Sequence, residues 1–472
     1  MPWAEGDRVT HHLQPTACID DGEPLMPYYS NTDDDRREML KAIAVKNFDE
    51  LIKDIPQEIR LKADLKIPPA MSELEVIKHL SALASKNVNT QDAISFLGAG
   101  AYDHFIPSAV GALLSRSEFY TAYTPYQAEV SQGTLQSIYE YQTMICRLTG
   151  MDVSNASLYD AGSGLAEAAL MSVAHTGRKK IITAHPIHPL YLQVIKTYVR
   201  GQGFEVVEVP SRNGIANIDA VKKAVDDSVA VVMVQQPSFL GTLSDVFALG
   251  EIAHSKKGLY AVDANPISLG LLAPPGEYGA DVVVGEGQSL GIPQSFGGPF
   301  LGIFAVKEAL IRRLPGRLAG VTIDTVGNRG FVLTLQTREQ QIRREKATSN
   351  ICTNEGLMML ASTIYMSLMG KQGFHEVAEQ SSAKAHYLAE QIGKIPGFSL
   401  KYHQPFFNEF LISTPVPAGR IVETALEKKI LAGLDVHRLD PAEDGLLIAV
   451  TEKRTREEMD MFAEFLKSFA HG

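Results

Sequence analysis

Short runs of apolar residues recur through the middle of the chain, each followed by a turn or a stretch of helix length. The runs are rich in valine and isoleucine and do not alternate with polar residues. They occupy residues 180–184, 204–209, 229–234, 259–262, 281–284 and 300–306. A strand buried on both faces gives such a continuous run, whereas a half-exposed strand alternates. The pattern therefore predicts a parallel sheet buried between helices.

On the N-terminal side of these runs, two capping motifs predict helices. Asn31-Thr32 precedes three aspartates, and Ser72-Glu73-Leu74-Glu75 has the spacing of a capping box. Acidic residues at a helix start are also favoured by the helix dipole. We therefore expect the first segment of the chain to form a helical arm.

Beyond residue 348 the pattern changes again. It predicts long helices at 356–369 and 377–395, and then separate strands at 398–402, 409–413 and 445–450. Another capping box, Thr455-Arg456-Glu457-Glu458, opens an amphipathic terminal helix. The expected parts of the chain are an irregular leader (1–25), an N-terminal helical arm (26–100), a large α/β domain (101–347) and a C-terminal α+β domain (348–472).

The composition argues against several classes of partner. Of 472 residues, 45% are hydrophobic and 21% charged, and the formal net charge of -11 gives no basic excess for nucleic acid or an anionic membrane. Cys18, Cys146 and Cys352 are too widely spaced for a disulfide framework or a metal cluster. No apolar run suits a bilayer span or a signal peptide. We expect a cytoplasmic protein without a metal, whose partner is a small molecule or a protein.

A glycine-rich segment precedes the first strand of the predicted sheet. Residues 158–167 read as a turn that leads into a helix beginning near Leu165. Backbone amides of Gly162 and Gly164, with the hydroxyl of Ser163, could hold a phosphate at the helix N-terminus. A tight turn without a ligand fits the same residues equally well.

Two further polar residues stand at the ends of predicted strands, where open α/β sheets bind their ligands. His185 could stack on an aromatic cofactor ring, or it could be an ordinary hydrogen-bonded histidine in a proline-shaped turn. Asp263 ends an apolar strand, and a buried carboxylate needs a partner such as a pyridinium proton. A helix cap in the following turn is the alternative role for Asp263.

The interval between Lys257 and Lys307 contains neither lysine nor arginine. In enzymes that bind pyridoxal phosphate on the aminotransferase scaffold, an aspartate pairs with the pyridinium nitrogen and a lysine on a later loop binds the cofactor. Asp263 has the position of that aspartate, but the position of the lysine holds Ser289. A serine hydroxyl does not replace the lysine, because only an amine condenses with the cofactor aldehyde to give an imine.

A segment of aromatic and hydroxyl residues surrounds Pro125. Its tyrosines and threonines would form a rigid loop that presents polar groups at an interface, although tyrosine clusters also occur in ordinary amphipathic packing. A basic group lies further along the chain, at Arg338, Arg343, Arg344 and Lys346. It is either a solvated helix face or a docking patch for an acidic carrier protein.

Several long motifs occur in order from about Met26 to the C-terminus. They are Tyr123-Thr124-Pro125-Tyr126-Gln127, Glu129-Val130-Ser131-Gln132-Gly133, Tyr141-Gln142-Thr143-Met144, Thr149-Gly150-Met151, Asn155-Ala156-Ser157 and the run 343–353. Together they resemble the N-terminal half of glycine decarboxylase, the P-protein of the glycine cleavage system. In organisms that split this protein into two chains, the resemblance is to subunit 1, the alpha subunit.

The resemblance implies an α/β fold of the pyridoxal-phosphate-dependent transferase type (aminotransferase fold type I), with a mainly parallel sheet in the large domain, an N-terminal helical arm and a small C-terminal α+β domain. In the other half of the family a His-Lys pair carries the cofactor, and that pair aligns with Gln288-Ser289 here. His185 aligns with a histidine that packs on the cofactor ring. The resemblance thus makes Gly162, Ser163, Gly164, His185 and Asp263 vestigial cofactor-binding candidates on a chain with no covalently bound cofactor.

The resemblance also implies a division of labour in glycine dehydrogenase (decarboxylating). Subunit 2 (beta) is expected to supply the lysine and pyridoxal phosphate. The complex would decarboxylate glycine, release CO2 and pass the aminomethyl group to the lipoyl arm of the H-protein. An alpha2beta2 heterotetramer is the expected assembly, and the isolated chain is predicted to be inactive. The alternatives are a lysine-less stand-alone pyridoxal-phosphate enzyme and a purely structural or regulatory scaffold subunit.

Enzymes of this fold commonly build each active site across a dimer interface, so this chain could complete the site of its partner. Two sets of residues are candidates for that contribution. The first choice is Tyr123, Thr124, Tyr126 and Gln127, and the second choice is Lys346, Thr348, Ser349 and Asn350.

Overall fold

The computed structural model describes residues 31–61, 65–69 and 71–470. The predicted leader at 1–25 and Cys18 lie outside these residues. The chain separates into two compact units, Met1–Val88 and Asn89–Gly472. The second unit therefore begins before residue 100, and it contains both the predicted α/β domain and the predicted α+β domain.

Three helices form the described part of the first unit. They are α1 (Asp33–Ala42), α2 (Phe48–Leu51) and α3 (Glu73–Ala84). Thr32 and Ser72 each make a capping box with the acid three residues later, so both predicted helix starts are confirmed. None of the described residues of these helices is buried, and apolar side chains such as Ile77 and Leu80 are more than half exposed.

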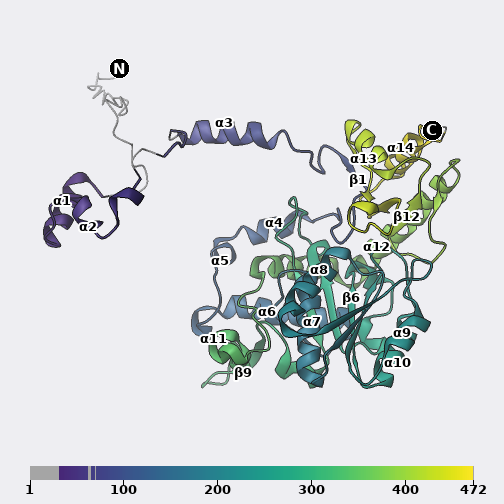
Figure 1. The fold of residues 1–472 in the computed structure, drawn as a ribbon, viewed down its shortest axis with the longest axis horizontal. Coiled ribbons are helices and arrows are strands. Elements are labelled where there is room, and N and C mark those ends of the chain that lie inside the picture. Colours follow the sequence, from purple (N-terminus) through teal and green to yellow (C-terminus); the bar gives the residue numbers. More distant parts are fainter. Residues whose placement is uncertain (1–30, 62–64, 70, 471–472) are drawn as a thin grey trace, which may run out of the picture. The chain divides into compact units, whose positions relative to one another are not determined.

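A seven-stranded sheet forms the centre of the second unit, within the described residues (Figure 1). Its spatial order is β2-β8-β7-β6-β5-β3-β4. The strands are β2 (Val153–Ser154), β3 (Lys180–Ala184), β4 (Glu205–Val209), β5 (Val229–Gln236), β6 (Leu259–Ala264), β7 (Val282–Glu286) and β8 (Gly302–Val306). All six predicted apolar runs are strands of this sheet.

The last of the six runs has the opposite direction to the other five, which agrees with the expected mainly parallel sheet. Strands β7, β6, β5, β3 and β4 are mutually parallel, but β8 pairs antiparallel with β7, and β2 pairs antiparallel with β8. A parallel neighbour needs a crossover connection, usually a helix, whereas an antiparallel neighbour does not. Residues 287–301 return directly from β7 to β8 without an α-helix. The sheet is therefore mainly, not wholly, parallel.

Helices cover both faces of the sheet. On one face α7 (Ala161–Thr176) packs on β5 to β8, and α8 (Pro189–Val199) packs on α7 (Figure 1). The other face shares a core with α6 (Gln132–Thr149), α9 (Ile218–Ala224), α10 (Val246–Ser255) and the first part of α12 (Gly356–Gly393). The double cover explains why the strands are continuous apolar runs.

Helix α7 begins earlier than the sequence predicts, at Ala161 instead of near Leu165. Asp160 is its cap, and the backbone amide of Ser163 donates to the Asp160 carboxylate at 2.7 Å. The glycines therefore lie inside the first helical turn and not in a preceding loop. A Cβ atom on Gly164 would stand 2.7 Å from a methyl carbon of Val284, so this glycine permits close packing of helix and sheet.

The C-terminal part has a four-stranded antiparallel sheet in the order β11-β12-β15-β14. Its strands are β11 (Ser399–Leu400), β12 (Glu409–Ser413), β14 (Leu434–Asp435) and β15 (Leu446–Ala449). Helices α13 (Ala418–Glu427) and α14 (Arg456–Lys467) share its core, with the second part of α12. The two predicted helices of α12 form one element with a break at Gly370, where φ is +58°.

Several shorter elements complete the second unit. Near the C-terminal sheet, β1 (Ile94–Ser95) pairs with β13 (Ile430–Leu431), and Phe96 lies in the C-terminal core. Strands β9 (Ala319–Ile323) and β10 (Arg329–Leu333) form an antiparallel hairpin. Short helices α4 (Ser108–Leu114), α5 (Ser117–Tyr120) and α11 (Gln340–Arg343) lie in the connections.

Among the described residues, no helix is long and apolar enough to cross a membrane. The same part of the chain contains no group of three or more histidine, cysteine, aspartate or glutamate side chains arranged to hold a metal ion.

The capping box of α14 is expected to contribute measurably to stability. The amide of Glu458 donates to the Thr455 hydroxyl at 3.2 Å, and the Glu458 carboxylate accepts from the Thr455 amide at 2.9 Å. Thr455→Ala should lower the free energy of unfolding by about 1 kcal/mol, because an amide at the helix start loses its partner. Thr424→Ala, in α13, is the control. It should lower the free energy of unfolding by less than Thr455→Ala does, because the Thr424 hydroxyl only donates to the Arg420 carbonyl of its own helix. Equal losses in urea unfolding would contradict the cap assignment.

Candidate functional site

The carboxyl ends of β6 and β7 bring buried acids to a small cavity of about 30 Å³. Asp263 and Glu286 come from these strand ends, and Glu409 comes from the start of β12 in the C-terminal part. Tyr102 and Tyr191 also line the cavity. The predicted location at the carboxyl edge of the sheet is therefore where these polar groups meet.

Asp263 points into this cavity without a protein partner. The residue is only 4% exposed, and no described residue donates a hydrogen bond to its carboxylate. Burial in this setting raises the pKa of Asp263 to about 7, because a low-dielectric environment disfavours the charged form. Its predicted use as a helix cap in the following turn is not seen, since Asn265 accepts from the amide of Ile267 instead.

Glu286 is bound by backbone amides from three places in the chain. Its carboxylate accepts from Ala161 at 3.2 Å, from Gln288 at 3.1 Å and from Leu301 at 3.0 Å. Burial raises the pKa of Glu286 to about 8, although the three amides lower it in part. Sequence reasoning missed this residue, because a glutamate at a strand end gives no signal of what it binds.

Glu409 connects the C-terminal part to the segment before α4. One of its oxygens accepts from the Ala99 amide at 2.7 Å, and the other accepts from the Tyr102 hydroxyl at 2.9 Å. Burial raises the pKa of Glu409 to about 7. These contacts were also missed, since residues 99 and 409 are far apart in the sequence.

Of the predicted phosphate-binding groups, Ser163 and the Gly164 amide are already engaged within the protein, the latter with the Asp160 carbonyl at 3.0 Å. The Ser163 hydroxyl donates to the Asp160 carbonyl at 3.0 Å and accepts from the Asp160 amide at 3.2 Å. The Ser163 amide donates to the Asp160 carboxylate, and the Ala161 amide donates to Glu286. Two of the three amides in the first turn of α7 therefore bind carboxylates of the same chain.

His185 lies at the end of β3, as predicted, but its ring points toward the edge strand β4. Its Nε2 is 3.7 Å from a carboxylate oxygen of Glu208, and burial lowers the pKa of its imidazole. Asp263 lies on β6 and His185 follows β3, and β5 lies between these two strands in the sheet. The residues that line the cavity do not include His185, and its stacking role stays a prediction.

His188 and Tyr191, which sequence reasoning did not single out, form a stacked aromatic pair beside the cavity. Their rings stack with centroids 4.4 Å apart and 19° between the planes. Burial lowers the pKa of His188 to about 4, so the ring is neutral. Nδ1 accepts from the Leu190 amide, and Nε2 therefore carries the proton and donates to the Ala99 carbonyl at 3.1 Å.

Ser289 lies in the loop after β7, in the short helix Gly287–Ser289. The residue is 4% exposed and its hydroxyl has no hydrogen-bond partner among the described residues. The neighbouring Gln288 is fully engaged: it accepts from the Tyr102 amide at 2.8 Å and donates to Ile292 and Tyr102 carbonyls. Neither side chain offers an amine.

These residues do not fit pyridoxal phosphate. The loop supplies no lysine, and the cavity of about 30 Å³ has room for a water or two but not for a substituted pyridine ring. Two of the three amides in the first turn of α7 already bind carboxylates. A negative phosphate would also lie among three buried acids.

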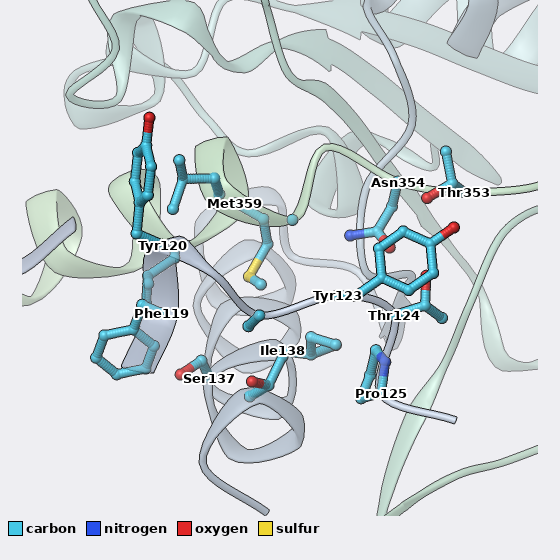
Figure 2. Close-up of a pocket in the computed structure, with 15 residues that line it drawn as sticks. Phe119, Tyr120, Tyr123, Thr124, Pro125, Ser137, Ile138, Thr353, Asn354 and Met359 are labelled. Carbon is cyan, nitrogen blue, oxygen red and sulfur yellow. The ribbon is translucent and has the colours of Figure 1, made fainter. Parts of the chain in front are cut away.

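A second, larger pocket of about 220 Å³ lies beside the aromatic segment (Figure 2). Tyr120 lies at one end, while Thr353 and Asn354 lie at the other end near Tyr123 and Thr124 (Figure 2). Helix α6 and the start of α12 form its floor through side chains such as Ile138 and Met359. Tyr123 is 84% exposed, so its ring is free to contact another molecule.

Arg317 holds the two loops of this pocket together. Its side chain is 3% exposed, and its guanidinium donates to the Cys352 carbonyl at 2.9 Å and to the Asn354 side chain at 3.0 Å. The same guanidinium lies 5.7 Å from the centre of the Tyr126 ring, within the range of a cation–π interaction. Sequence reasoning missed Arg317, since an isolated arginine gives no sign of its partners.

The structure separates the two predicted sets of interface residues. Tyr123 and Thr124 line the aromatic pocket, and Tyr126 contacts its Arg317 support, while Gln127 is exposed beyond it. Thr348 and Ser349 line a different crevice of about 20 Å³, with Arg338 and Arg343. Lys346 and Asn350 are exposed. Thr353 and Asn354, which directly follow the second set, are the residues that reach the first.

Asp263 should make stability depend on pH in a specific direction. Its folded pKa of about 7 exceeds the ordinary 3.8, so the folded state keeps a proton that the unfolded chain loses. Its contribution to stability therefore falls as the pH rises from about 4 to 7. Asp263→Asn cannot ionise at this position. As the pH rises from about 4 to 7, its free energy of unfolding should therefore rise by about 1–4 kcal/mol relative to that of the parent.

The measurement is urea unfolding of both proteins at several pH values. Asp226→Asn is the control with the opposite sign, because the Lys180 ammonium lowers the pKa of that exposed carboxyl. A constant difference between Asp263→Asn and the parent across this range would contradict the assignment.

Comparison of the sequence with known proteins identifies its family. A family model described as "Glycine cleavage system P-protein" matches residues 26–466. The probable glycine dehydrogenase (decarboxylating) subunit 1 of Chlorobium phaeobacteroides is 60% identical over 442 residues, which is 93% of this chain and 99% of that protein.

Comparison with solved structures gives the same family and the same fold. A crystal structure of glycine decarboxylase (P-protein) of the glycine cleavage system, in inhibitor-bound form, superposes with a TM-score of 0.86 at 40% identity, covering 94% of this chain and all of that one. The sphingosine-1-phosphate lyase of Burkholderia pseudomallei, with a TM-score of 0.64, 15% identity and coverage of 88% and 94%, shares the fold alone. The predicted fold class is thus confirmed, and the chain belongs to the glycine cleavage system P-protein family.

Proposed function

We propose that this chain is subunit 1 of a two-chain glycine dehydrogenase (decarboxylating) and that it acts together with a second subunit. The carrying observation is Ser289, which stands at the lysine position in a chain that matches subunit 1 relatives over nearly its whole length. A side chain without an amine cannot hold the cofactor aldehyde covalently. Subunit 2 then carries both the lysine and pyridoxal phosphate.

In this proposal the complex decarboxylates glycine, releases CO2 and transfers the aminomethyl group to the lipoyl arm of the H-protein. The expected assembly contains two copies of each subunit. The contribution of this chain is to complete the active site of its partner with groups that bind and orient substrate and exclude water, and not with the covalent group.

The aromatic pocket supports this contribution. It combines a highly exposed tyrosine, hydroxyl and amide groups, and a buried arginine that makes its two loops rigid. Interfaces are enriched in tyrosine and arginine, and a tyrosine ring buries a large area at a low cost in side-chain entropy. Tyr123, Thr124 and Asn354 are therefore the groups that we assign to the partner site, with Tyr126 as a support and Gln127 at the rim.

One experiment separates this function from its alternatives. The chain is purified alone and together with subunit 2, and cofactor absorbance and exchange of labelled bicarbonate into glycine are measured. We expect both signals only when subunit 2 is present, and full exchange only with both subunits. Cofactor absorbance or exchange in the isolated chain would favour a stand-alone enzyme, while full activity of subunit 2 alone would contradict the proposal.

Tyr123→Ala tests whether this loop completes the partner site. The side chain is 84% exposed, so its removal should leave the fold of the isolated chain unchanged. The exchange rate of the reconstituted complex should fall by about 10-fold or more, because positioning groups contribute effects of that size. Val326→Ala, which is 79% exposed in the β9–β10 hairpin, is the control. Unchanged exchange in the Tyr123 variant would favour a scaffold role.

Only part of the basic group is accessible to a carrier protein. Arg338 is largely buried and donates to the carbonyls of Leu335 and Gly316, both at 3.1 Å, so it stabilises the chain locally. Arg343, Arg344 and Lys346 are exposed. These three side chains are the ones available to an acidic lipoyl carrier.

The double variant Arg343→Glu/Lys346→Glu should weaken use of the H-protein. We expect KM for the H-protein to rise by about 5- to 10-fold with little change in kcat, because surface charges mainly affect encounter. The effect should shrink at high salt. Arg420→Glu, on the exposed face of α13, is the control. An unchanged KM at low salt would identify the basic group as a solvated surface.

A further inference from the structure

The first turn of α7 is occupied by acidic groups of the protein itself. The Asp160 carboxylate accepts from the Ser163 amide at 2.7 Å, and the Glu286 carboxylate accepts from the Ala161 amide at 3.2 Å. Exposed amides and the helix dipole make such a turn an attractive place for an anion. Here the anion is supplied from within the chain.

Glu286 is placed there by the sheet and not by the helix. It ends β7, and its other oxygen accepts from the Gln288 and Leu301 amides. One carboxylate thereby satisfies amides of three segments: the start of α7, the loop that contains Ser289, and the residue before β8. A phosphate, with its several acceptor oxygens, could satisfy the same kind of donor set.

An aromatic side chain of the protein covers the same helix turn. A Cβ atom added to Gly162 would lie 3.2 Å from Cδ1 of Tyr191, and one added to Gly100 would lie 2.9 Å from the Tyr191 hydroxyl. The Tyr191 ring therefore lies between these two glycines, stacked on His188. It lines the cavity into which Asp263 points.

The remaining space confirms that these groups fill the region. Asp263, Glu286 and Tyr191 line one cavity of about 30 Å³, enough for a water or two. A ligand that reached from Asp263 to the first turn of α7 would have to displace Tyr191 and Glu286. The loss of a lysine at position 289 is thus only one of the differences from a cofactor site.

We propose that this chain has replaced a bound cofactor with its own side chains: the Glu286 and Asp160 carboxylates take the place of a phosphate at α7, and the Tyr191 ring takes the place of the cofactor ring. The region is a closed internal clamp that joins α7, β7 and β8. Restoring a lysine alone does not reopen it.

Removal of the Glu286 carboxylate should create a phosphate site. Glu286→Ala leaves three amides without their acceptor, so the full-length variant should melt several degrees below the parent. Inorganic phosphate should raise the melting temperature of this variant, and that of the parent much less. Glu409→Ala is the matched control, because it removes a buried acid of the same cavity whose partners are Ala99 and Tyr102 and not α7. Equal stabilisation of parent, variant and control by phosphate would overturn the proposal.

Cofactor uptake gives a second readout, and its first variant, Ser289→Lys, keeps Glu286 in place and so does not depend on the folding of Glu286→Ala. Ser289→Lys alone should take up no pyridoxal phosphate in equilibrium dialysis, and reduction with borohydride should give no labelled peptide containing position 289. The triple variant Ser289→Lys/Glu286→Ala/Tyr191→Ala should take up the cofactor at least 10-fold more tightly than Ser289→Lys. Tight, reducible binding by Ser289→Lys alone, or uptake by the parent chain, would overturn the proposal.

Discussion

The contact on which the second unit most depends is the Glu286 carboxylate with its three backbone amides. An unpaired buried carboxylate would be costly, and three unpaired amides would be costly as well. Their pairing fixes the start of α7, the loop after β7 and the entry to β8 against one another. The geometry of the former cofactor region follows from it.

The contacts of Glu286 leave no cofactor site at the carboxyl edge of the sheet. In a cofactor enzyme of this fold, amides at the helix start, an acid at a strand end and a lysine converge on one ligand. Here the amides bind Glu286 and Asp160, Ser289 is buried, and Asp263 faces a cavity too small for a cofactor. The polar groups that remain accessible are those of the aromatic pocket, on the loops before α6 and α12. A subunit that supplies loops to a neighbour needs only a rigid scaffold behind them.

Features that depend on local pattern could be predicted from the sequence. Continuous apolar runs identified the six longer strands of the central sheet, and the spacing of Thr455 and Glu458 identified the start of α14, because both depend on neighbouring residues. The hairpin of β9 and β10 was not predicted. Features that depend on distant contacts could not. The Ala161 amide at the start of α7 binds Glu286 from 125 residues away, and the direction of β8 depends on the absence of a crossover. The sequence singled out His185, but His188, which follows the same strand, is the histidine that stacks on Tyr191 beside the cavity.

Arg317 explains why the candidate interface loops belong together although their motifs are more than 200 residues apart. A buried guanidinium is costly unless its donors are used. Here the two terminal nitrogens of Arg317 donate to Cys352, Thr353 and Asn354, while Nε has no partner among the described residues and the face of the group lies over Tyr126. These contacts order two loops that would otherwise lose conformational entropy when a partner binds. The two loops are therefore already ordered in the folded chain. The exposed Tyr123 ring and its neighbours can contact a partner without a further loss of conformational entropy in the loops.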